Sequence, residues 1–268
     1  MSTAFSPLQL GLRYLGYYLK AANGKGHGTH SPFVFNFILD VLNNRPGYVP
    51  PPAIEELRRS LLADQTLLPV EDHGAGSRAG AARNRSVKKL ASVAVKPPKW
   101  GQLLYRLVRR YQPGTILELG TSLGVTTSYL AAGHPGAQVI TVEGSPAIAA
   151  RASENFRSLG LTNIQAVTGT FDAVLPDLLQ QFPSVDLAYL DGNHRLEPTL
   201  KYFGQLLPAV HNDSIFVFDD IHWSRGMETA WNTIRQHPQV GCTIDLFFLG
   251  MVFFRKEFRE KQHFTIRF

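Results

Sequence analysis

Hydrophobic and polar residues alternate in two different ways along this chain. Up to residue 112, apolar positions recur three or four residues apart, a spacing that predicts amphipathic helices at 7–20, 32–43, 53–63 and 99–111. From residue 113 onward, short apolar runs alternate with segments of helix length. The pattern therefore predicts a helical first part and a mixed α/β second part.

The apolar runs of the second part contain few polar residues, which is typical of strands that are buried on both faces of a parallel sheet. These runs lie at 115–119, 138–142, 163–167, 185–190 and 214–218. Two further runs, 243–249 and 251–255, meet at Gly250 without room for a helix, which predicts an antiparallel hairpin at the sheet edge. The predicted fold class is α/β, a doubly wound, Rossmann-like and mostly parallel sheet with a C-terminal antiparallel hairpin and a helical N-terminal appendage.

The length of 268 residues suits one large domain with an appendage. We predict a helical N-terminal cap over residues 1–98 and a core over residues 99–268. A stretch near 71–86 is rich in Gly, Ala and Arg and has no hydrophobic period, so we expect a flexible loop there.

Charge is distributed unevenly between the two parts. Residues 1–112 carry 16 Lys and Arg against 6 Asp and Glu, whereas residues 113–268 carry 11 against 15. A basic surface attracts phosphate, nucleic acid or anionic lipid. The chain has no apolar run long enough to span a bilayer and a single cysteine, Cys242, so we expect a cytoplasmic protein without a transmembrane segment. A homo-oligomer is compatible with these features.

A glycine-containing turn follows the first predicted strand, at residues 118–124. Glycines let the backbone approach a ligand where the next helix presents free N–H groups. Glu143 ends the second strand, at the place where α/β nucleotide sites put a carboxylate for the ribose hydroxyls. A polar and aromatic segment follows the third strand and could contact a base. The candidate cofactor-binding residues are Glu118, Gly120, Thr121, Ser122, Gly124, Glu143, Gly144, Thr170, Phe171, Asp172 and Asp191.

Acidic residues and histidines follow the fourth and fifth strands. Asp191 and His194 come after the fourth, and Asp219, Asp220 and His222 come after the fifth. Ligands of open parallel sheets bind beyond these carboxyl ends. Carboxylate oxygens suit Mg²⁺, Ca²⁺ or Mn²⁺, and a nearby histidine can act as a base or as an additional ligand.

In their order along the chain, these motifs resemble the class I S-adenosylmethionine-dependent methyltransferases over residues 99–255. The resemblance implies that the turn at 118–124 surrounds the methionine moiety, that Glu143 binds the ribose and that residues 170–172 lie at the adenine.

The residues after the fourth and fifth strands look like those of the catechol and caffeoyl-coenzyme A type of O-methyltransferase, in which aspartates hold a divalent metal. Asp191, Asp219 and Asp220 match those positions, so the resemblance implies a site for Mg²⁺ or another divalent cation. We predict three catalytic residues from the chemistry of methyl transfer: Asp191, because it lies at the junction between the cofactor and acceptor sites, and His194 and His222, either of which could accept the proton of the hydroxyl.

The sequence thus predicts an enzyme that methylates a hydroxyl of a small acceptor, with an anionic acceptor as one option. Three alternatives stay open: an RNA or protein methyltransferase that uses the basic first part, an NAD-dependent oxidoreductase, and a non-catalytic binding protein. The first is weakened because the Asn/Asp-Pro-Pro-aromatic motif of many base-amine methyltransferases is missing from the sequence. The oxidoreductase is disfavoured because Ser122 replaces the middle glycine of the dinucleotide fingerprint.

Overall fold

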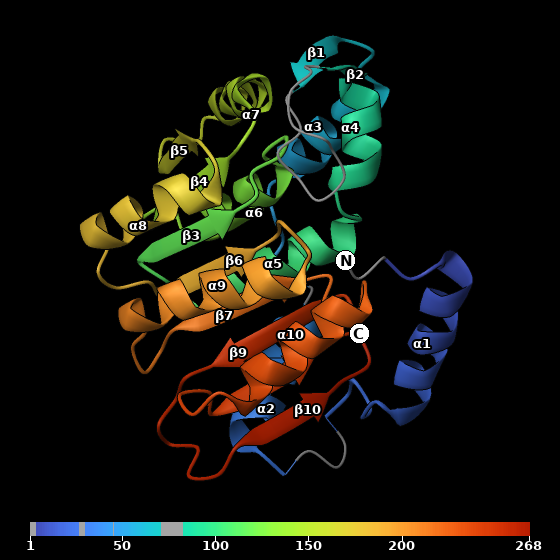
Figure 1. The fold of residues 1–268 in the computed structure, drawn as a ribbon, viewed down its shortest axis with the longest axis vertical. Coiled ribbons are helices and arrows are strands. Elements are labelled where there is room, and N and C mark those ends of the chain that lie inside the picture. The colour runs from blue at the N-terminus through green and yellow to red at the C-terminus, as the bar shows by residue number, and fades with distance from the viewer. Residues whose placement is uncertain (1–3, 27–29, 45, 71–82) are drawn as a thin grey trace. The chain divides into compact units, whose positions relative to one another are not determined.

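The computed structural model describes residues 4–26, 30–44, 46–70 and 83–268, whose helices and strands are drawn in Figure 1. The α-helices are α1 (Pro7–Lys20), α2 (Pro32–Phe37), α3 (Pro52–Ala63), α4 (Val87–Ala94), α5 (Pro98–Tyr111), α6 (Val125–Gly133), α7 (Pro146–Ser158), α8 (Phe171–Gln181), α9 (Leu196–Leu206) and α10 (Arg225–Gln236). A π-helical segment, Ile38–Leu42, continues α2, and a 3-10 turn, Leu207–Ala209, continues α9. The strands are β1 (Leu67–Val70), β2 (Arg83–Ser86), β3 (Thr115–Leu119), β4 (Gln138–Glu143), β5 (Ile164–Thr168), β6 (Leu187–Leu190), β7 (Ile215–Asp219), β8 (Cys242–Asp245), β9 (Leu249–Phe253) and β10 (Gln262–Thr265).

The chain divides into two compact units. The first unit comprises Met1–Leu39 and Leu178–Phe268, and the second comprises Asp40–Asp177. The N-terminal helix α1 belongs with the C-terminal strands because the backbone fastens both of its ends to them: the Phe5 N–H donates to the Trp223 carbonyl at 3.0 Å, and the Ala22 N–H donates to the Thr265 carbonyl at 2.8 Å. The predicted boundary between residues 98 and 99 does not coincide with this division.

In the second unit, β3, β4 and β5 pair in parallel in that order. Helices α3 to α6 of this unit contribute to one apolar core, which contains Ile54, Leu61, Val87, Ala91, Tyr105, Leu123, Val125 and Tyr129. β1 and β2 form an antiparallel pair beside α3 and α4. The flexible loop predicted near 71–86 is therefore wrong for residues 83–86, which form β2, and its remainder at 71–82 lies outside the described residues.

In the first unit, the strand order is β10-β8-β9-β7-β6. β6 and β7 are parallel, and β9 pairs antiparallel with both β7 and β8, so the predicted antiparallel hairpin is confirmed. Its turn is not at Gly250, which lies inside β9, where a Cβ atom would come within 2.7 Å of the Trp231 ring. Glycine is required there by packing, and the turn lies at 246–248. The hairpin is not the edge either, because β10 adds a parallel strand beside β8.

The predicted fold class is confirmed: helices alternate with strands, and all the described strand pairs among β3 to β7 are parallel. The first predicted strand matches β3 from Thr115 to Leu119, and the four that follow match β4 to β7 to within two residues at each end. In both units the strands point their carboxyl ends toward the segments that carry the candidate site residues.

Candidate functional site

The turn after β3 is shaped by its backbone. Gly120 and Gly124 have φ angles of 113° and 79°, and Ser122 between them has 48°, so three residues adopt the left-handed region that favours glycine. The N–H groups of Gly120 and Thr121 both donate to the carbonyl of Val142 at the end of β4. The turn is thereby fixed to the neighbouring strand, and α6 begins directly after it at Val125.

Glu143 is held in place by the same turn. The Ser122 N–H donates to its Oε2 at 2.9 Å, and the Ser145 N–H donates to its Oε1 at 3.0 Å. Gly144 lies between Glu143 and Ser145, and the Gly169 N–H bonds the Glu143 carbonyl at 2.9 Å. A carboxylate offers about four lone-pair sites, so a half-buried Glu143 with one backbone donor on each oxygen can accept further hydrogen bonds from a diol.

Glu118 lies at the base of the turn and is fully buried. Its Oε2 accepts hydrogen bonds from the hydroxyls of Thr127 and Thr141, the latter at 2.6 Å, and the Thr141 hydroxyl also lies 2.6 Å from that of Thr121. This carboxylate ties β3, β4 and α6 together. Direct contact of Glu118 with a cofactor stays a prediction, and the bonds show that Glu118 positions the turn.

The third predicted cofactor segment lies at the start of α8. The Thr170 carbonyl accepts from the N–H groups of Ala173 and Val174, while Phe171 is half-buried and Asp172 is exposed. The sequence thus places an aromatic side chain and a carboxylate on the first turn of a helix. Their contact with adenine stays a prediction.

In the first unit, the structure brings together Asp191, His194 and Asp219. One ligand atom from each lies within 4.8 Å of the others. His194 Nε2 is 3.4 Å from Asp191 Oδ1, and the Tyr189 hydroxyl donates to Asp191 Oδ2 at 3.1 Å. Asp219 is buried at the end of β7, whereas Asp191 and His194 are half-buried. The two carboxylates are donors that suit Mg²⁺ or Mn²⁺, and an imidazole is a donor that suits transition-metal ions, so these residues fit a divalent cation.

Asp220, the third metal ligand predicted from the sequence, is not part of this group within the described residues. Its backbone has a φ angle of 52°, and its N–H donates to the Phe248 carbonyl at 2.7 Å. Asp220 instead lines a separate cavity of about 50 Å³, formed with Leu10, His222, Trp223, Phe247 and Phe248. His194, for which the sequence left open the roles of base and of additional metal ligand, is the third member of the cluster.

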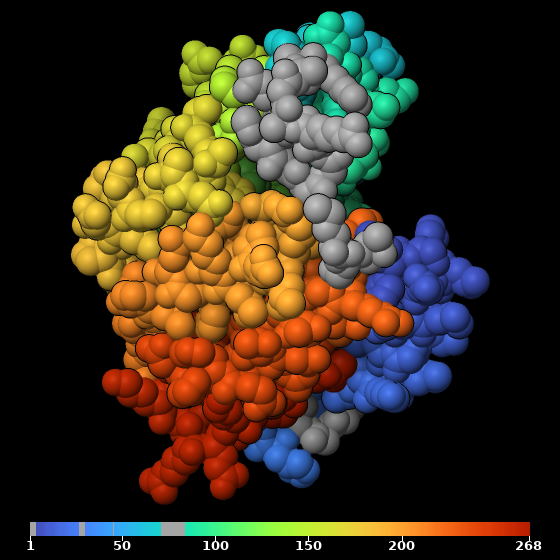
Figure 2. All heavy atoms as spheres, viewed as in Figure 1, coloured from blue at the N-terminus to red at the C-terminus, as the bar shows by residue number. Residues whose placement is uncertain are grey.

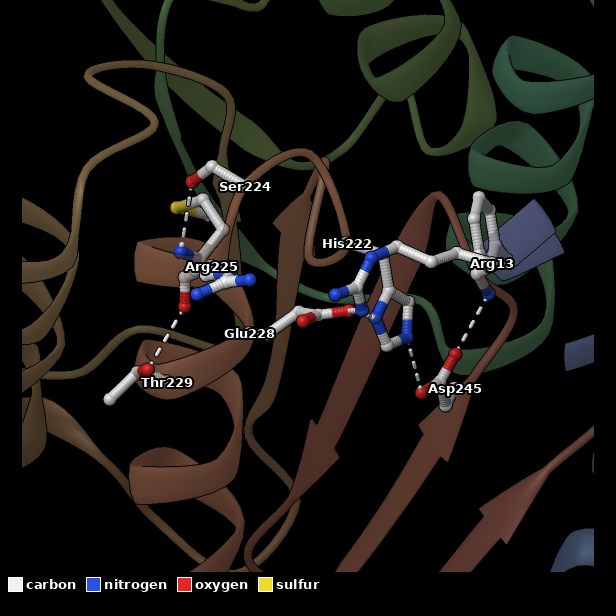
Figure 3. Close-up of polar contacts among 9 residues, drawn as sticks. Arg13, His222, Ser224, Arg225, Glu228, Thr229 and Asp245 are labelled. Carbon is white, nitrogen blue, oxygen red and sulfur yellow. Dashed lines mark hydrogen bonds and ion pairs between the residues drawn. The ribbon is translucent and has the colours of Figure 1, made fainter. Parts of the chain in front are cut away.

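His222 is clamped between two carboxylates, as Figure 3 shows. Its Nε2 lies 2.9 Å from Asp245 Oδ2, its Nδ1 lies 3.2 Å from Glu228 Oε1, and its ring stacks on Phe247. Burial lowers the pKa of His222, but the bonds to Asp245 and Glu228 outweigh it and raise this pKa above the ordinary value of 6.5. Both ring nitrogens of His222 are engaged with carboxylates, so neither is placed to take a proton from an acceptor hydroxyl. The geometry therefore argues against the predicted catalytic role of His222.

Sequence reasoning missed the partners of this histidine. Glu228 also forms an ion pair with Arg13 on α1, and Asp245 ends β8. Only the spacing of six residues between His222 and Glu228, across the start of α10, could have indicated one of these contacts. Arg13 and Asp245 are too distant along the chain for a local signal.

Comparison with known proteins finds a family that resembles the central part of this chain. The sequence family described as "Methyltransferase domain" matches residues 117–221, a stretch that begins in β3 and includes Glu118, Glu143, Asp191 and Asp219. Residues 117–221 of this chain therefore resemble a methyltransferase domain.

Curated proteins that match part of this chain are named O-methyltransferases. A catechol O-methyltransferase of Niastella koreensis is 32% identical over 127 residues, which cover 46% of this chain and 57% of the relative. The human transmembrane O-methyltransferase is 38% identical over 88 residues, covering 32% of this chain and 30% of the relative. The aligned part thus spans about a third to a little over half of these curated relatives. Among the described residues, no helix is long and apolar enough to cross a membrane.

Solved structures agree on the fold. An O-methyltransferase from Bacillus cereus in complex with SAH has a TM-score of 0.57 and 19% identity, and the match covers 82% of this chain and 97% of that one. A putative caffeoyl-CoA O-methyltransferase from Staphylococcus aureus has a TM-score of 0.54 and 14% identity, covering 62% of this chain and 90% of that one. The resemblance to class I methyltransferases of the catechol and caffeoyl-coenzyme A type is confirmed.

Proposed function

We propose that this chain transfers a methyl group from S-adenosylmethionine to a hydroxyl oxygen of a small acceptor. The observation that carries the proposal is the turn at 120–124, whose backbone holds Glu143 through the Ser122 N–H within the matched domain. A carboxylate fixed by backbone donors at a strand end is suited to the two hydroxyls of a ribose. The O-methyltransferase relatives support the acceptor atom.

Methyl transfer from a sulfonium is an in-line displacement, so the protein must orient a lone pair of the acceptor and remove one proton. We assign cofactor binding to the turn and Glu143, and orientation of the acceptor to Asp191 and Asp219. His194 is the candidate base, because it is half-buried and its Nε2 lies 3.4 Å from a carboxylate that stabilises the imidazolium.

A divalent cation fits Asp191, His194 and Asp219, and when bound it would lower the pKa of an acceptor hydroxyl. If His194 ligates such a cation, the proton goes to another base. Removing the cation distinguishes these roles.

The decisive experiment uses the purified full chain and S-adenosylmethionine with an isotopically labelled methyl group. We expect labelled methyl on catechol-type or other small hydroxyl-bearing acceptors, detected by mass spectrometry, and micromolar binding of S-adenosylhomocysteine by calorimetry. A folded protein without affinity for either form of the cofactor would contradict the proposal. Chelation with EDTA followed by return of Mg²⁺ tests the cation.

We further propose that residues 1–98 form a cap that selects the acceptor. Three other properties stay predictions: the charge of the acceptor, the cytoplasmic location and the oligomeric state. The RNA or protein methyltransferase is the weaker reading, because the relatives named in the comparisons are O-methyltransferases of the catechol type. Binding to nucleic acid that falls steeply with added salt would revive it.

A further inference from the structure

Helix α1 of the first unit exposes a continuous apolar stripe. Leu8, Leu12, Leu15 and Leu19 are 74%, 62%, 53% and 69% exposed, although leucines of this spacing normally face a core. At 100° per residue the four side chains fall within about 60° of one another around the helix axis. Figure 2 shows α1 as the dark-blue helix at the molecular surface.

The exposure of this leucine stripe is not a result of a loose helix. The opposite side of α1 is docked: Tyr17 packs against Phe247 and donates to the Ile266 carbonyl, and Arg13 pairs with Glu228. Both ends are fastened by backbone hydrogen bonds, from Phe5 to Trp223 and from Ala22 to Thr265. The fold therefore holds the helix firmly and presents its leucines outward.

The charge beside the stripe is positive. The first 39 residues contain no Asp or Glu, and Lys20 is exposed in the last turn of α1. Tyr18, exposed on the flank of the stripe, carries the guanidinium of Arg267 over its ring at 4.7 Å. Leucines bordered by tyrosine and by basic side chains are typical of helices that lie in the interface of a bilayer.

We infer that α1 docks this chain onto an anionic membrane surface, with the leucine stripe inserted at the level of the headgroups and with Lys20 and Arg267 facing acidic lipids. The flanking cations favour this occupant over an apolar protein groove, because they gain from negative lipid charge. A second copy of α1 is less suited, since 14 residues provide about two heptads, whereas a stable coiled coil takes three or four. Membrane docking by α1 is independent of methyl transfer, so either can fail alone.

The test is flotation of the full chain with vesicles of equal parts phosphatidylcholine and phosphatidylglycerol, compared with phosphatidylcholine alone. We expect the protein to float with the mixed vesicles and much less with the neutral ones. The double variant Leu12→Glu/Leu15→Glu should lose affinity by about tenfold or more, because two apolar insertions are replaced by charges that anionic lipid repels. The control is Val93→Glu on α4, an apolar-to-acidic change at a residue that is 85% exposed outside the stripe, and it should bind as the unchanged protein does.

Two further measurements keep the outcome clear. Lys20→Gln should weaken binding to the mixed vesicles about fivefold and should not change the weak binding to neutral ones. Circular dichroism and thermal melts should show that the double variant folds. Equal flotation of the double variant and the unchanged protein overturns the inference, as does an unchanged protein that fails to float. If light scattering instead shows a dimer that the double variant dissociates while no flotation occurs, the stripe is a contact between two copies.

Discussion

The turn with Glu143 in the second unit and the acidic cluster in the first unit are built in different ways. In the turn, backbone N–H groups do the positioning: those of Gly120 and Thr121 bond the end of β4, and that of Ser122 bonds the Glu143 carboxylate. In the cluster, side chains converge, and Asp191 and Asp219 bring two carboxylates within 4.8 Å of each other and of His194. Backbone donors favour the charged carboxylate, whereas two neighbouring carboxylates disfavour each other's charge.

The two regions should therefore respond differently to substitution. The shape of the turn depends on the left-handed conformation of its glycines, so we expect substitutions there to lower stability first, by straining the backbone. Two neighbouring carboxylates would be stabilised by a positive charge such as a bound divalent cation, so we expect substitutions there to act first on ligand binding and reaction. Each of the following predictions tests one side of this contrast.

The largest effect is expected in the cluster. Asp219→Asn should lower kcat by about 10²- to 10⁴-fold, because it removes a buried charge from the group that we propose to orient the acceptor. Steady-state kinetics at saturating S-adenosylmethionine measures the change. Asp213→Asn is the matched control, since Asp213 pairs with Arg255 at an exposed position outside the site. Equal kinetics for the two variants would remove Asp219 from the proposed machinery.

The backbone of the turn is tested by Gly124→Ala. Gly124 has a φ angle of 79°, which is unfavourable for alanine, and an added Cβ atom would come within 2.4 Å of the Phe156 ring. Because both effects oppose the substitution, we expect a loss of about 2–4 kcal/mol in unfolding free energy. Gly160→Ala separates the two causes. Gly160 has a φ angle of 67° but no heavy atom within 4 Å of the added Cβ, so it should lose only about 1 kcal/mol. Urea denaturation measures both, and similar losses would show that packing against Phe156 is unimportant.

Glu143→Ala tests whether the pinned carboxylate binds the cofactor. Loss of hydrogen bonds to a charged acceptor, worth about 1.5–3 kcal/mol, should weaken binding of S-adenosylhomocysteine by roughly 10- to 100-fold. Isothermal titration calorimetry measures this. Glu154→Ala on α7, where Glu154 is exposed and lies 3.6 Å from Arg151, should bind like the unchanged protein. Unaltered affinity after Glu143→Ala would show that the carboxylate held by the turn does not bind the cofactor.

The features that local sequence determines were predictable. Strand β3 has the predicted bounds, and Glu143 ends β4, because buried apolar runs are bounded by polar residues that must reach the end of the sheet. Features that depend on a single backbone angle or on residues far away in the sequence could not be predicted. Asp220 and Asp219 look equivalent in sequence, yet the φ angle of 52° directs Asp220 out of the cluster. Gly250 resembled a turn residue because sequence does not show the Trp231 ring that excludes a side chain there.

The smallest effect is expected for His222, the histidine between two carboxylates, and not for His194 in the acidic cluster. His222→Gln removes an imidazole that is bonded to Asp245 and Glu228, and because Glu228 is partly exposed we expect a cost of about 1 kcal/mol, or about 2–4 °C in Tm. The folded-state pKa of His222 is raised above 6.5 by these carboxylates against the effect of burial. Its contribution to stability is therefore fully present below pH 6.5 and is lost as the pH rises through the raised pKa.

Thermal melts of the unchanged protein and of His222→Gln should accordingly differ most on the acidic side of pH 6.5 and converge at alkaline pH. His263→Gln provides a control of opposite sign, because burial and the charges of Arg235 and Lys261 lower the pKa of His263. The contribution of a lowered pKa is present above pH 6.5 and disappears as the pH falls through it. If both variants showed the same pH trend, the carboxylate clamp would not be what holds the proton on His222, and a catalytic role for this histidine would be open again.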